Sequence, residues 1–539
     1  MMESGRSVRG GWAVGIGLWL AFGNMATAAD WPQWRGPDRN GIAPESPALS
    51  ETWPPEGPPK VWQSEAIPSA EQGNLSSPVV AGGKVYLHVN WRYKDPIATR
   101  TLPDGGLRNL GWRPEKMPEE LLKQVEEARA SEERAKLPGN EVGKWVEAWA
   151  AAHLLTDEQK KLADVVKNRL NRGKDALGLG ILDKLATIKD KPFATQEDLD
   201  KWLAENGIEE ELKKKVVGQI PTTRDLADDT LVCLDAADGK TLWKVKFPSA
   251  ATGWDASSTP CVAGKRLYVH GSQKNVYCLD VEKGNVVWTN RASQGNNISS
   301  SFLVQDGLAV ILAGPLTAFD AQTGEVKWTQ PKISGNNPSP VLWKNGDRMC
   351  VICNTGGNLG CADLKTGDVL WTVPGGSSST TAVSNDLLVV FSDRKEVGMT
   401  GYRLLPDKAE TAWTLALNDR GASPIIANGR VYAIGGGGGG RAVCVDVATG
   451  QAAWDEKVGS QEISSPILAD GKIVALVDNY SSLAMWKASP EKFAILAKAK
   501  VGAAACTSPA FAGGKLFLRV SNGVACYDLT VKPPAPAAP

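Results

Sequence analysis

The stretch Asp320–Trp328, DAQTGEVKW, decides the fold, because its Asp, Gly and Trp recur along the chain at constant offsets. In each copy the Gly lies four residues after the Asp, and the Trp lies eight residues after it. The other copies begin at Asp235, Asp280, Asp363 and Asp446. From Trp243 onward, successive repeat Trp residues are 45, 40, 43, 42 and 41 residues apart. A period of this length indicates stacked copies of one supersecondary unit.

Each unit has the pattern of four short strands, with β-branched and aromatic runs separated by Gly turns. The Asp can accept backbone N–H groups inside the last turn, and the Gly supplies the positive φ that closes it. The Trp then stands on the outer strand, where its large apolar face can pack against the next unit. These features predict an all-β array of four-stranded sheets.

The number of units follows from the starts of the inner strands, which are short and rich in Ser, Thr and Pro. Eight such starts occur, at Ser76, Ser257, Ser299, Pro338, Ser379, Ala422, Ser464 and Thr507. The last unit reaches Asp528 without an outer strand, whereas a spare strand, Lys60–Trp62, precedes the first start. Closing the ring with this strand leaves no exposed sheet edge. We therefore predict an eight-bladed β-propeller of four-stranded blades, closed by an N-terminal strand.

One interval is too long for a single blade, because Trp62 and Trp243 are 181 residues apart. The excess is rich in helix formers with apolar residues at helical spacing, and Thr156 and Thr195 have the pattern of helix caps. We predict an α-helical insertion in blade 1. The predicted divisions are a signal peptide (1–29), an N-terminal extended segment (30–59), the closing strand with the start of blade 1 (60–94), the helical insertion (95–229), the rest of the propeller (230–530) and a Pro/Ala tail (531–539).

Composition and the N-terminus indicate an exported protein. The formal net charge is zero, with 60 basic and 60 acidic residues, so we expect no nucleic-acid partner. Residues 1–29 have the pattern of a signal peptide whose apolar run is short for a membrane span; an uncleaved anchor is the alternative. No Cys precedes Cys233, so no lipidated Cys is available. We expect a soluble, non-lipidated periplasmic or extracellular protein with no membrane span after signal removal.

The nine cysteines are not expected to form disulfides or a metal site. Five of them share one repeat position, two residues before the Asp: Cys233, Cys278, Cys361, Cys444 and Cys526. Equivalent positions in different blades lie beyond the reach of a disulfide. Cys350 and Cys353 form a CxxC in a predicted strand, where this spacing places them on opposite faces. With three His in the chain, we expect no histidine-based site either.

The unit D-x-x-T-G-x-x-x-W, intact at Asp320–Trp328, Asp363–Trp371 and Asp446–Trp454, resembles the tryptophan-docking repeat of the pyrroloquinoline-quinone (PQQ) propeller superfamily. That superfamily includes eight-bladed PQQ-dependent alcohol dehydrogenases and the envelope assembly lipoprotein BamB. The likeness covers about residues 60–530 apart from the insertion. The stretch Trp31–Pro37, WPQWRGP, is similar to the start of exported PQQ-repeat proteins of unassigned role.

Several features of the enzymes in that superfamily have no counterpart here. The dehydrogenases place two adjacent Cys over the quinone and use a Glu/Asn/Asp set for calcium together with a catalytic Asp. This chain has no adjacent Cys pair, and no residue aligns with that set through a shared motif. It also has no CxxCH for a c-type haem. BamB-like scaffolds carry a lipidated Cys, which is absent as well. We therefore assign no catalytic residue and no metal ligand.

The loops that lead into the inner strands share one face of a propeller, around the central channel. They contain Asn74, Asp255, Asn296, Asn297, Asn336, Asn337, Asp419, Arg420, Gln461 and Glu462. Converging oxygens of this kind suit calcium, a sugar or a peptide, whereas simple turn formation is the alternative. The candidate cofactor-binding residues at the channel mouth are Trp254, as a stacking surface for a planar ligand, with Asp255, Asn296, Asn297, Asn336 and Asn337.

The expected function is that of a non-enzymatic PQQ-repeat propeller that binds a protein or carbohydrate partner at the cell envelope, as a scaffold. The alternative is a PQQ- and calcium-dependent quinoprotein oxidoreductase that resembles alcohol or sugar dehydrogenases. The resemblance implies PQQ and calcium as cofactors for this alternative, and no recognisable site in the sequence supports them.

Overall fold

The computed structural model describes residues 30–67, 75–250, 257–292, 299–376, 378–436, 439–460 and 463–531. The predicted signal peptide and all but the first residue of the predicted Pro/Ala tail lie outside these ranges. The chain forms two compact units, one of residues 1–91 with 228–539 and one of residues Arg92–Ala227. No helix in the described ranges is long and apolar enough to cross a membrane.

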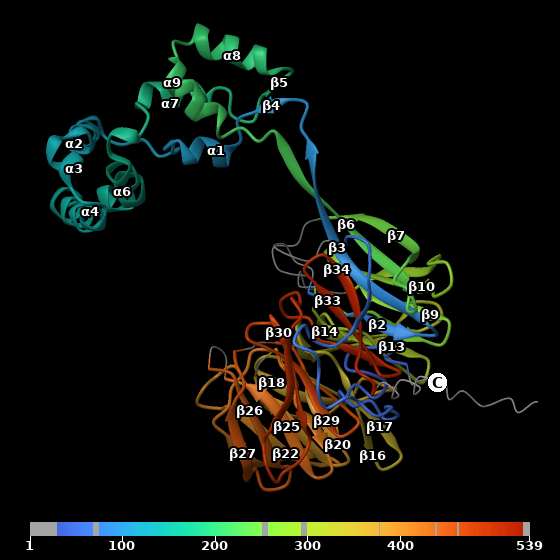
Figure 1. Ribbon diagram of the computed structural model, residues 1–539. Helices are drawn as coiled ribbons and strands as arrows, with labels where there is room; N and C mark the ends of the chain where they lie inside the picture. The colour runs from blue at the N-terminus through green and yellow to red at the C-terminus, as the bar shows by residue number, and fades with distance from the viewer. Residues whose placement is uncertain are drawn as a thin grey trace, which may run out of the picture. The chain divides into compact units, whose positions relative to one another are not determined.

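The first unit is all-β, and its described residues form eight antiparallel sheets of four strands each (Figure 1). Four sheets consist of β2 (Val79–Ala81), β3 (Lys84–Pro96), β6 (Thr223–Asp235) and β7 (Thr241–Ser249); β8 (Cys261–Ala263), β9 (Arg266–His270), β10 (Asn275–Asp280) and β11 (Val286–Arg291); β12 (Leu303–Gln305), β13 (Leu308–Leu312), β14 (Gly314–Asp320) and β15 (Val326–Gly335); and β16 (Val341–Asn345), β17 (Arg348–Asn354), β18 (Asn358–Asp363) and β19 (Val369–Pro374). The others consist of β20 (Ala382–Ser384), β21 (Leu387–Phe391), β22 (Met399–Leu405) and β23 (Lys408–Leu415); β24 (Ile425–Ala427), β25 (Arg430–Gly435), β26 (Arg441–Asp446) and β27 (Ala452–Lys457); β28 (Ile467–Ala469), β29 (Lys472–Val477), β30 (Ser482–Lys487) and β31 (Ile495–Lys500); and β32 (Ala510–Ala512), β33 (Lys515–Val520), β34 (Gly523–Asp528) and β1 (Lys60–Gln63). The prediction of an all-β fold of four-stranded sheets is confirmed.

The repeated Gly and Trp join each sheet to the next one. Gly324 has a φ of +76°, and a Cβ placed on it would lie 2.5 Å from the Trp288 ring of the preceding sheet. Trp288 Nε1 donates a hydrogen bond to Ala321 O (3.1 Å), next to the repeat Asp. The same contact joins Gly239 to Trp62, Gly284 to Trp243, Gly367 to Trp328 and Gly450 to Trp413. The repeat therefore encodes the interface between sheets: Gly removes the side chain that would displace the indole.

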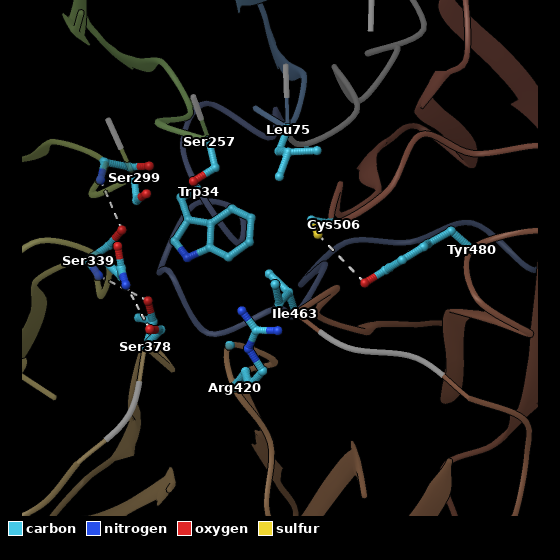
Figure 2. A pocket seen from close by; sticks show the side chains of 14 residues that line it. Trp34, Leu75, Ser257, Ser299, Ser339, Ser378, Arg420, Ile463, Tyr480 and Cys506 are labelled. Atoms are coloured by element: carbon cyan, nitrogen blue, oxygen red, sulfur yellow. Dashed lines mark hydrogen bonds between the residues drawn. The ribbon is translucent and has the colours of Figure 1, made fainter. Parts of the chain in front are cut away.

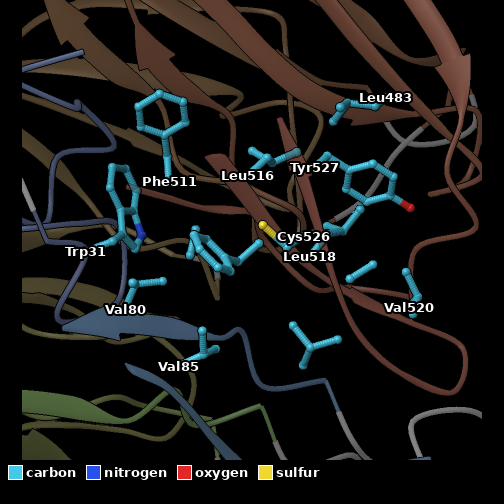
Figure 3. Packing of buried hydrophobic residues seen from close by; sticks show 14 of the residues in the cluster. Trp31, Val80, Val85, Leu483, Phe511, Leu516, Leu518, Val520, Cys526 and Tyr527 are labelled. Carbon is cyan, nitrogen blue, oxygen red and sulfur yellow. The ribbon is translucent and has the colours of Figure 1, made fainter. Parts of the chain in front are cut away.

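The N-terminal strand β1 pairs antiparallel with the last strand, β34, and Trp62 lies opposite Cys526. Trp62 also covers Gly239 and donates from Nε1 to Ala236 O (3.0 Å) of the first sheet. The strand thus belongs to the last sheet and contacts the first sheet through its indole. A hydrophobic cluster continues across this junction, with Trp31, Val80 and Phe511 lying together (Figure 3).

Hydroxyl groups at the starts of the inner strands link neighbouring sheets, because each accepts a backbone N–H of the preceding sheet at 2.9–3.1 Å. The bonds run from N–H to hydroxyl as Ser77 to Thr259, Thr259 to Ser301, Ser301 to Ser339, Ser339 to Thr380, Ser423 to Ser465, Ser465 to Ser508 and Ser508 back to Ser77. Between the fifth and sixth sheets, Ser379 Oγ donates to Ala422 O (2.7 Å). These bonds place the eight strand starts side by side.

The second unit is mainly helical. Its described elements are α1 (Asp104–Asn109), α2 (Glu119–Ala130), α3 (Glu132–Lys136), α4 (Gly139–His153), α5 (Asp157–Lys161), α6 (Ala163–Arg172), α7 (Leu179–Ala186), α8 (Gln196–Glu205), α9 (Glu210–Val217), β4 (Arg100–Thr101) and β5 (Pro192–Phe193). Thr156 and Thr195 form capping boxes, as predicted. Apolar residues of α2, α4 and α6 pack on each other, so their stripes form the unit's own core.

In the sequence, the elements of this unit follow β3 and precede β6, and these two strands are neighbours in the first sheet. The sequence pattern predicts that these strands stop near Val89 and start near Leu231, but in the structure they extend to Pro96 and from Thr223. Beyond their ends, Ile97 N still donates to Thr222 O (2.9 Å). The extension escapes pattern analysis because it consists mainly of charged and polar residues, and because its partner lies more than a hundred residues away in the sequence.

Candidate functional site

A cavity of about 530 Å³ lies where the loops that lead into the inner strands converge (Figure 2). We call it the channel pocket. Its lining comes from every sheet: Leu75 before β2, Ser257 before β8, Ser299 and Ser301 before β12, Asn337 and Ser339 before β16, Ser378 and Thr380 before β20, Arg420 and Gly421 before β24, Ile463 before β28, and Cys506 before β32, with Tyr480 and Trp34. The pocket therefore exists only when all the sheets are assembled.

Residues 31–49, which we call the crossing segment, bind across the inner strands. Trp31 forms an antiparallel bridge with Val80, and Ile42 forms a parallel bridge with Leu468. Between them, Pro32 O accepts a hydrogen bond from Val262 N (2.7 Å). These three partners, Val80, Val262 and Leu468, each come shortly after the pocket-lining residue of the same sheet in the sequence, which is Leu75, Ser257 or Ile463. The crossing segment thus lies on the strand side of the channel pocket and forms its floor.

Two buried arginines hold the crossing segment in place. Arg35 donates to Pro424 O and, through its other terminal nitrogen, to Thr381 O (3.5 Å). Arg39 donates to Phe302 O (2.6 Å) and Ser301 O (3.1 Å). Burial lowers the pKa of Arg35 to about 9 and that of Arg39 to about 10. Both guanidinium groups therefore remain charged at neutral pH, and carbonyl oxygens of distant sheets solvate them.

Trp34 of the crossing segment is half-buried and lines the channel pocket. Its indole lies among the labelled lining residues in Figure 2, with Ser257, Ser339 and Arg420 around it. An indole in this place offers an apolar face at the bottom of a cavity that several hydroxyl groups line.

Three lining residues have a left-handed backbone although none of them is Gly. The φ angles are 74° at Ile463, 66° at Tyr480 and 61° at Cys506. Left-handed conformations are costly for such residues, most of all for β-branched Ile, and they cluster at ligand-binding sites. Asp478 and Asn479, which precede Tyr480, share this conformation. Five of the left-handed non-Gly residues in the described ranges thus lie on this wall of the pocket or next to it.

Cys506 is the partly exposed member of the nine cysteines, all of which are thiols and lie within the described ranges. Its Sγ lies 3.7 Å from Tyr480 Oη. The other eight side chains are buried, among them the five at the shared repeat position. Reagents for thiols therefore have one preferred target, and it lies in the channel pocket.

The predicted site residues are only partly described. Trp254, Asp255, Asn296 and Asn297 lie outside the described ranges, as do Asn74, Gln461 and Glu462. Asn337 lines the pocket, and its Nδ2 donates to Ser378 Oγ (2.8 Å). Asn336 instead bridges loops, because its Oδ1 accepts from Gly314 N (3.2 Å). Asp419 Oδ1 accepts from Gly421 N (2.8 Å) and Ala422 N (2.6 Å), which is the turn-forming role.

A second polar cluster surrounds the buried carboxylate of Asp229. Its Oδ2 accepts from Ser272 N (2.8 Å) and Tyr277 Oη (3.1 Å), and its Oδ1 lies 3.5 Å from His88 Nε2. Burial raises the pKa of Asp229, but these partners, led by His88, outweigh burial and hold that pKa below its usual value. Burial also lowers the pKa of nearby His270 to about 4. In the described part of the chain, no three His, Cys, Asp or Glu residues are grouped to hold a metal.

Comparison with known families decides the classification. The family model described as "Outer membrane protein assembly factor BamB" matches residues 222–415 and 403–494, which together are just over half of the chain. The chain belongs to this family of PQQ-repeat, BamB-like β-propellers.

Curated relatives in this family share about a quarter of their residues with the chain. The BamB of Burkholderia pseudomallei is 26% identical over 312 residues, which cover 55% of this chain and 78% of the relative. That of Salmonella typhimurium is 25% identical over 305 residues, which cover 45% and 76%.

Among solved structures, BamB from Moraxella catarrhalis matches with a TM-score of 0.45 and 14% identity, covering 56% of this chain and 90% of that one. Quinohemoprotein alcohol dehydrogenase from Comamonas testosteroni matches with a TM-score of 0.43 and 13% identity, covering 58% and 74%. Superpositions at this level do not transfer any residue's role.

The wider superfamily makes PQQ and calcium the groups to test against the pocket. Calcium takes six to eight oxygen ligands that usually include carboxylates. The described lining provides hydroxyls and the Asn337 amide, but no Asp or Glu. These residues do not fit a calcium site, and we derive no chemistry through a quinone.

Sequence reasoning missed the hydroxyl lining and the crossing segment. The Ser and Thr residues that start the inner strands indicate the number of sheets, and their repetition at the same place in each sheet also predicts a shared lining. In the crossing segment, Arg35 and Arg39 flank turns at Gly36 and Gly41, and all four have positive φ. Two Arg close to a Trp in a stretch without strand or helix pattern are the feature of the sequence that indicates a buried contact here.

Proposed function

We propose that the eight sheets form one closed propeller and that residues Arg92–Ala227 are an insertion in its first blade. The hydroxyl links that run from Ser77 through the successive sheets and back to Ser77 support the ring. The pairing of β1 with β34 supports closure by the N-terminal strand. The position of the helices between β3 and β6 supports the insertion.

On this frame, we propose that the protein is a non-enzymatic scaffold that binds a protein partner during outer membrane protein assembly. The observation that carries this proposal is the match of the BamB family model across residues 222–494. The curated relatives named above are described as outer membrane protein assembly factors. Residues 1–29, with the pattern of a signal peptide, add support for a periplasmic location.

The partner surface is the rim of the channel pocket. It includes the exposed side chains of Asn337 and Arg420 and, as proposed neighbours, Asn336 and the lead-in residues Trp254, Asp255, Asn296 and Asn297. A rim of amides and charges around a cavity suits polar recognition of a folded partner better than a flat apolar surface would.

Deletion of the gene tests this role. We expect the amounts of integral outer membrane proteins to fall, and the wild-type gene to restore them. Arg420→Glu on the rim should restore them poorly, whereas Arg403→Glu, exposed on β22, should restore them fully. An unchanged outer membrane proteome in the deletion strain would overturn the proposal.

Titration of the purified protein with PQQ and Ca²⁺ distinguishes the scaffold proposal from the oxidoreductase alternative. The scaffold predicts no spectral change and no dye-linked oxidation of alcohols or sugars. Tight PQQ binding together with such oxidation would overturn the scaffold proposal in favour of the oxidoreductase alternative.

A further inference from the structure

The channel pocket has the chemistry of a small-ligand site, and the proposed assembly role uses only its rim. Its volume of about 530 Å³ lies within the range of ligand pockets in proteins. The crossing segment floors it, with Trp34 at the bottom. We propose that the channel pocket binds a short saccharide, neutral or with a single acid group. The inference stands apart from the proposed scaffold role.

The hydroxyl lining supplies groups that both donate and accept hydrogen bonds. Ser301, Ser339 and Thr380 each accept one backbone N–H from the neighbouring sheet, which orients the hydroxyl. These three side chains are buried, whereas the lining residues Ser257, Ser299 and Ser378 are partly exposed at the cavity, where a hydroxyl can donate to a ligand and accept from it. Hydroxyls repeated around the ring match the vicinal hydroxyls of a sugar, which also donate and accept.

Trp34 supplies the apolar complement. A pyranose ring has polar edges and a face of C–H groups, and such a face packs favourably on an indole. The indole lies at the centre of the labelled lining in Figure 2, and Ser257, Ser299 and Ser339 lie beside it. A sugar stacked on this ring directs its hydroxyls toward the serine wall.

Charge narrows the class of ligand. Among the described lining residues, Arg420 is the charged side chain and no carboxylate is present, so cationic ligands are disfavoured.

The thiol of Cys506 provides the test, because it is partly exposed and lines the same cavity. The full chain is alkylated with iodoacetamide in the presence of cellobiose, maltotriose or cellobiouronic acid, which has one carboxyl group, and modification of Cys506 is followed by peptide mass spectrometry. A saccharide at ten times its Kd should slow alkylation about tenfold, since only the empty site reacts. Protection by the first two sugars indicates a neutral ligand, and protection by the third alone indicates an acidic one.

Saturation-transfer NMR of the same sugars gives a readout that does not involve the thiol. Trp34→Ala should abolish both signals and Trp34→Phe should weaken them, whereas Trp149→Ala on helix α4 should leave them unchanged. Circular dichroism and the unfolding midpoint show whether each variant is folded. The proposal fails if none of the sugars binds the wild type up to about 10 mM. It also fails if Trp34→Ala binds as tightly as the wild type, or if short peptides protect Cys506 and sugars do not.

Discussion

Replacement of Gly324 by Ala tests how the repeat holds the propeller together. Gly324 has a φ of +76°, and an added Cβ would lie 2.5 Å from two atoms of the Trp288 ring. Trp288 is 7% exposed and packs against Phe319. The methyl group must therefore displace the indole or move the turn, and both damage the contact between adjacent sheets.

The cost has two parts. A left-handed conformation costs a residue with a Cβ about 1–2 kcal/mol relative to Gly. Forcing an extra methyl into a packed contact costs about 1–3 kcal/mol more. Gly307 provides a matched control, because its φ is also +76° but nothing lies within 4 Å of its added Cβ. Gly307→Ala should therefore show only the first part.

The assay is chemical denaturation of each variant, with the unfolding transition followed by tryptophan fluorescence. We expect Gly324→Ala to lower the free energy of unfolding by about 1–3 kcal/mol more than Gly307→Ala does. In a Trp288→Ala background this difference should vanish, because the clashing ring is gone. Equal losses for the two glycine variants would refute the docking role of the repeat.

Three further predictions concern the floor, the buried histidine and the helical unit. Arg39→Met leaves the carbonyls of Ser301 and Phe302 without their donors, so it should destabilise the protein by at least about 2 kcal/mol, while Arg403→Met, exposed on β22, should stay near wild type in the same denaturation assay. The pKa of His270 is about 4 in the folded state against 6.5 unfolded, so the unfolded state binds more protons between these values. The free energy of unfolding should therefore fall by about 3 kcal/mol as the pH drops from 6.5 to 4; His270→Gln should flatten this slope and His153→Gln should not, and an unchanged slope in His270→Gln contradicts the assignment. Replacing residues 98–221 by a short Gly-Ser turn should leave the propeller's thermal transition intact, since Ile97 N and Thr222 O already close the ladder; loss of that transition would show that the helical unit supports the propeller.

The repeat made the sheets predictable because its chemistry is local. The Asp–Gly turn and the Trp, which lies eight residues after the Asp, belong to one hairpin. The structure of each unit is therefore determined by residues that are close together in the sequence. The crossing segment has no such period: Arg35 and its acceptor Pro424 O are 389 residues apart, and the contact appears only when the sheets are assembled. The same reason limited the site prediction. Asn336 and Asn337 are equivalent candidates by residue type, but of these two only Asn337 lines the pocket, because the conformation of the loop decides where each side chain points.

The channel, its floor and its lining all depend on a ring closed by strand β1, and one cross-link tests that closure directly. Gln63 and Ala525 are paired across β1 and β34, and opposed residues in an antiparallel pair lie within disulfide reach. Oxidation of the double variant Gln63→Cys with Ala525→Cys should join the two peptides, as read by mass spectrometry. Neither single variant should form this link, nor should Gln63→Cys with Ala427→Cys in another sheet. If both introduced thiols of the folded double variant stay open to alkylation after oxidation, the ring is not closed by this strand.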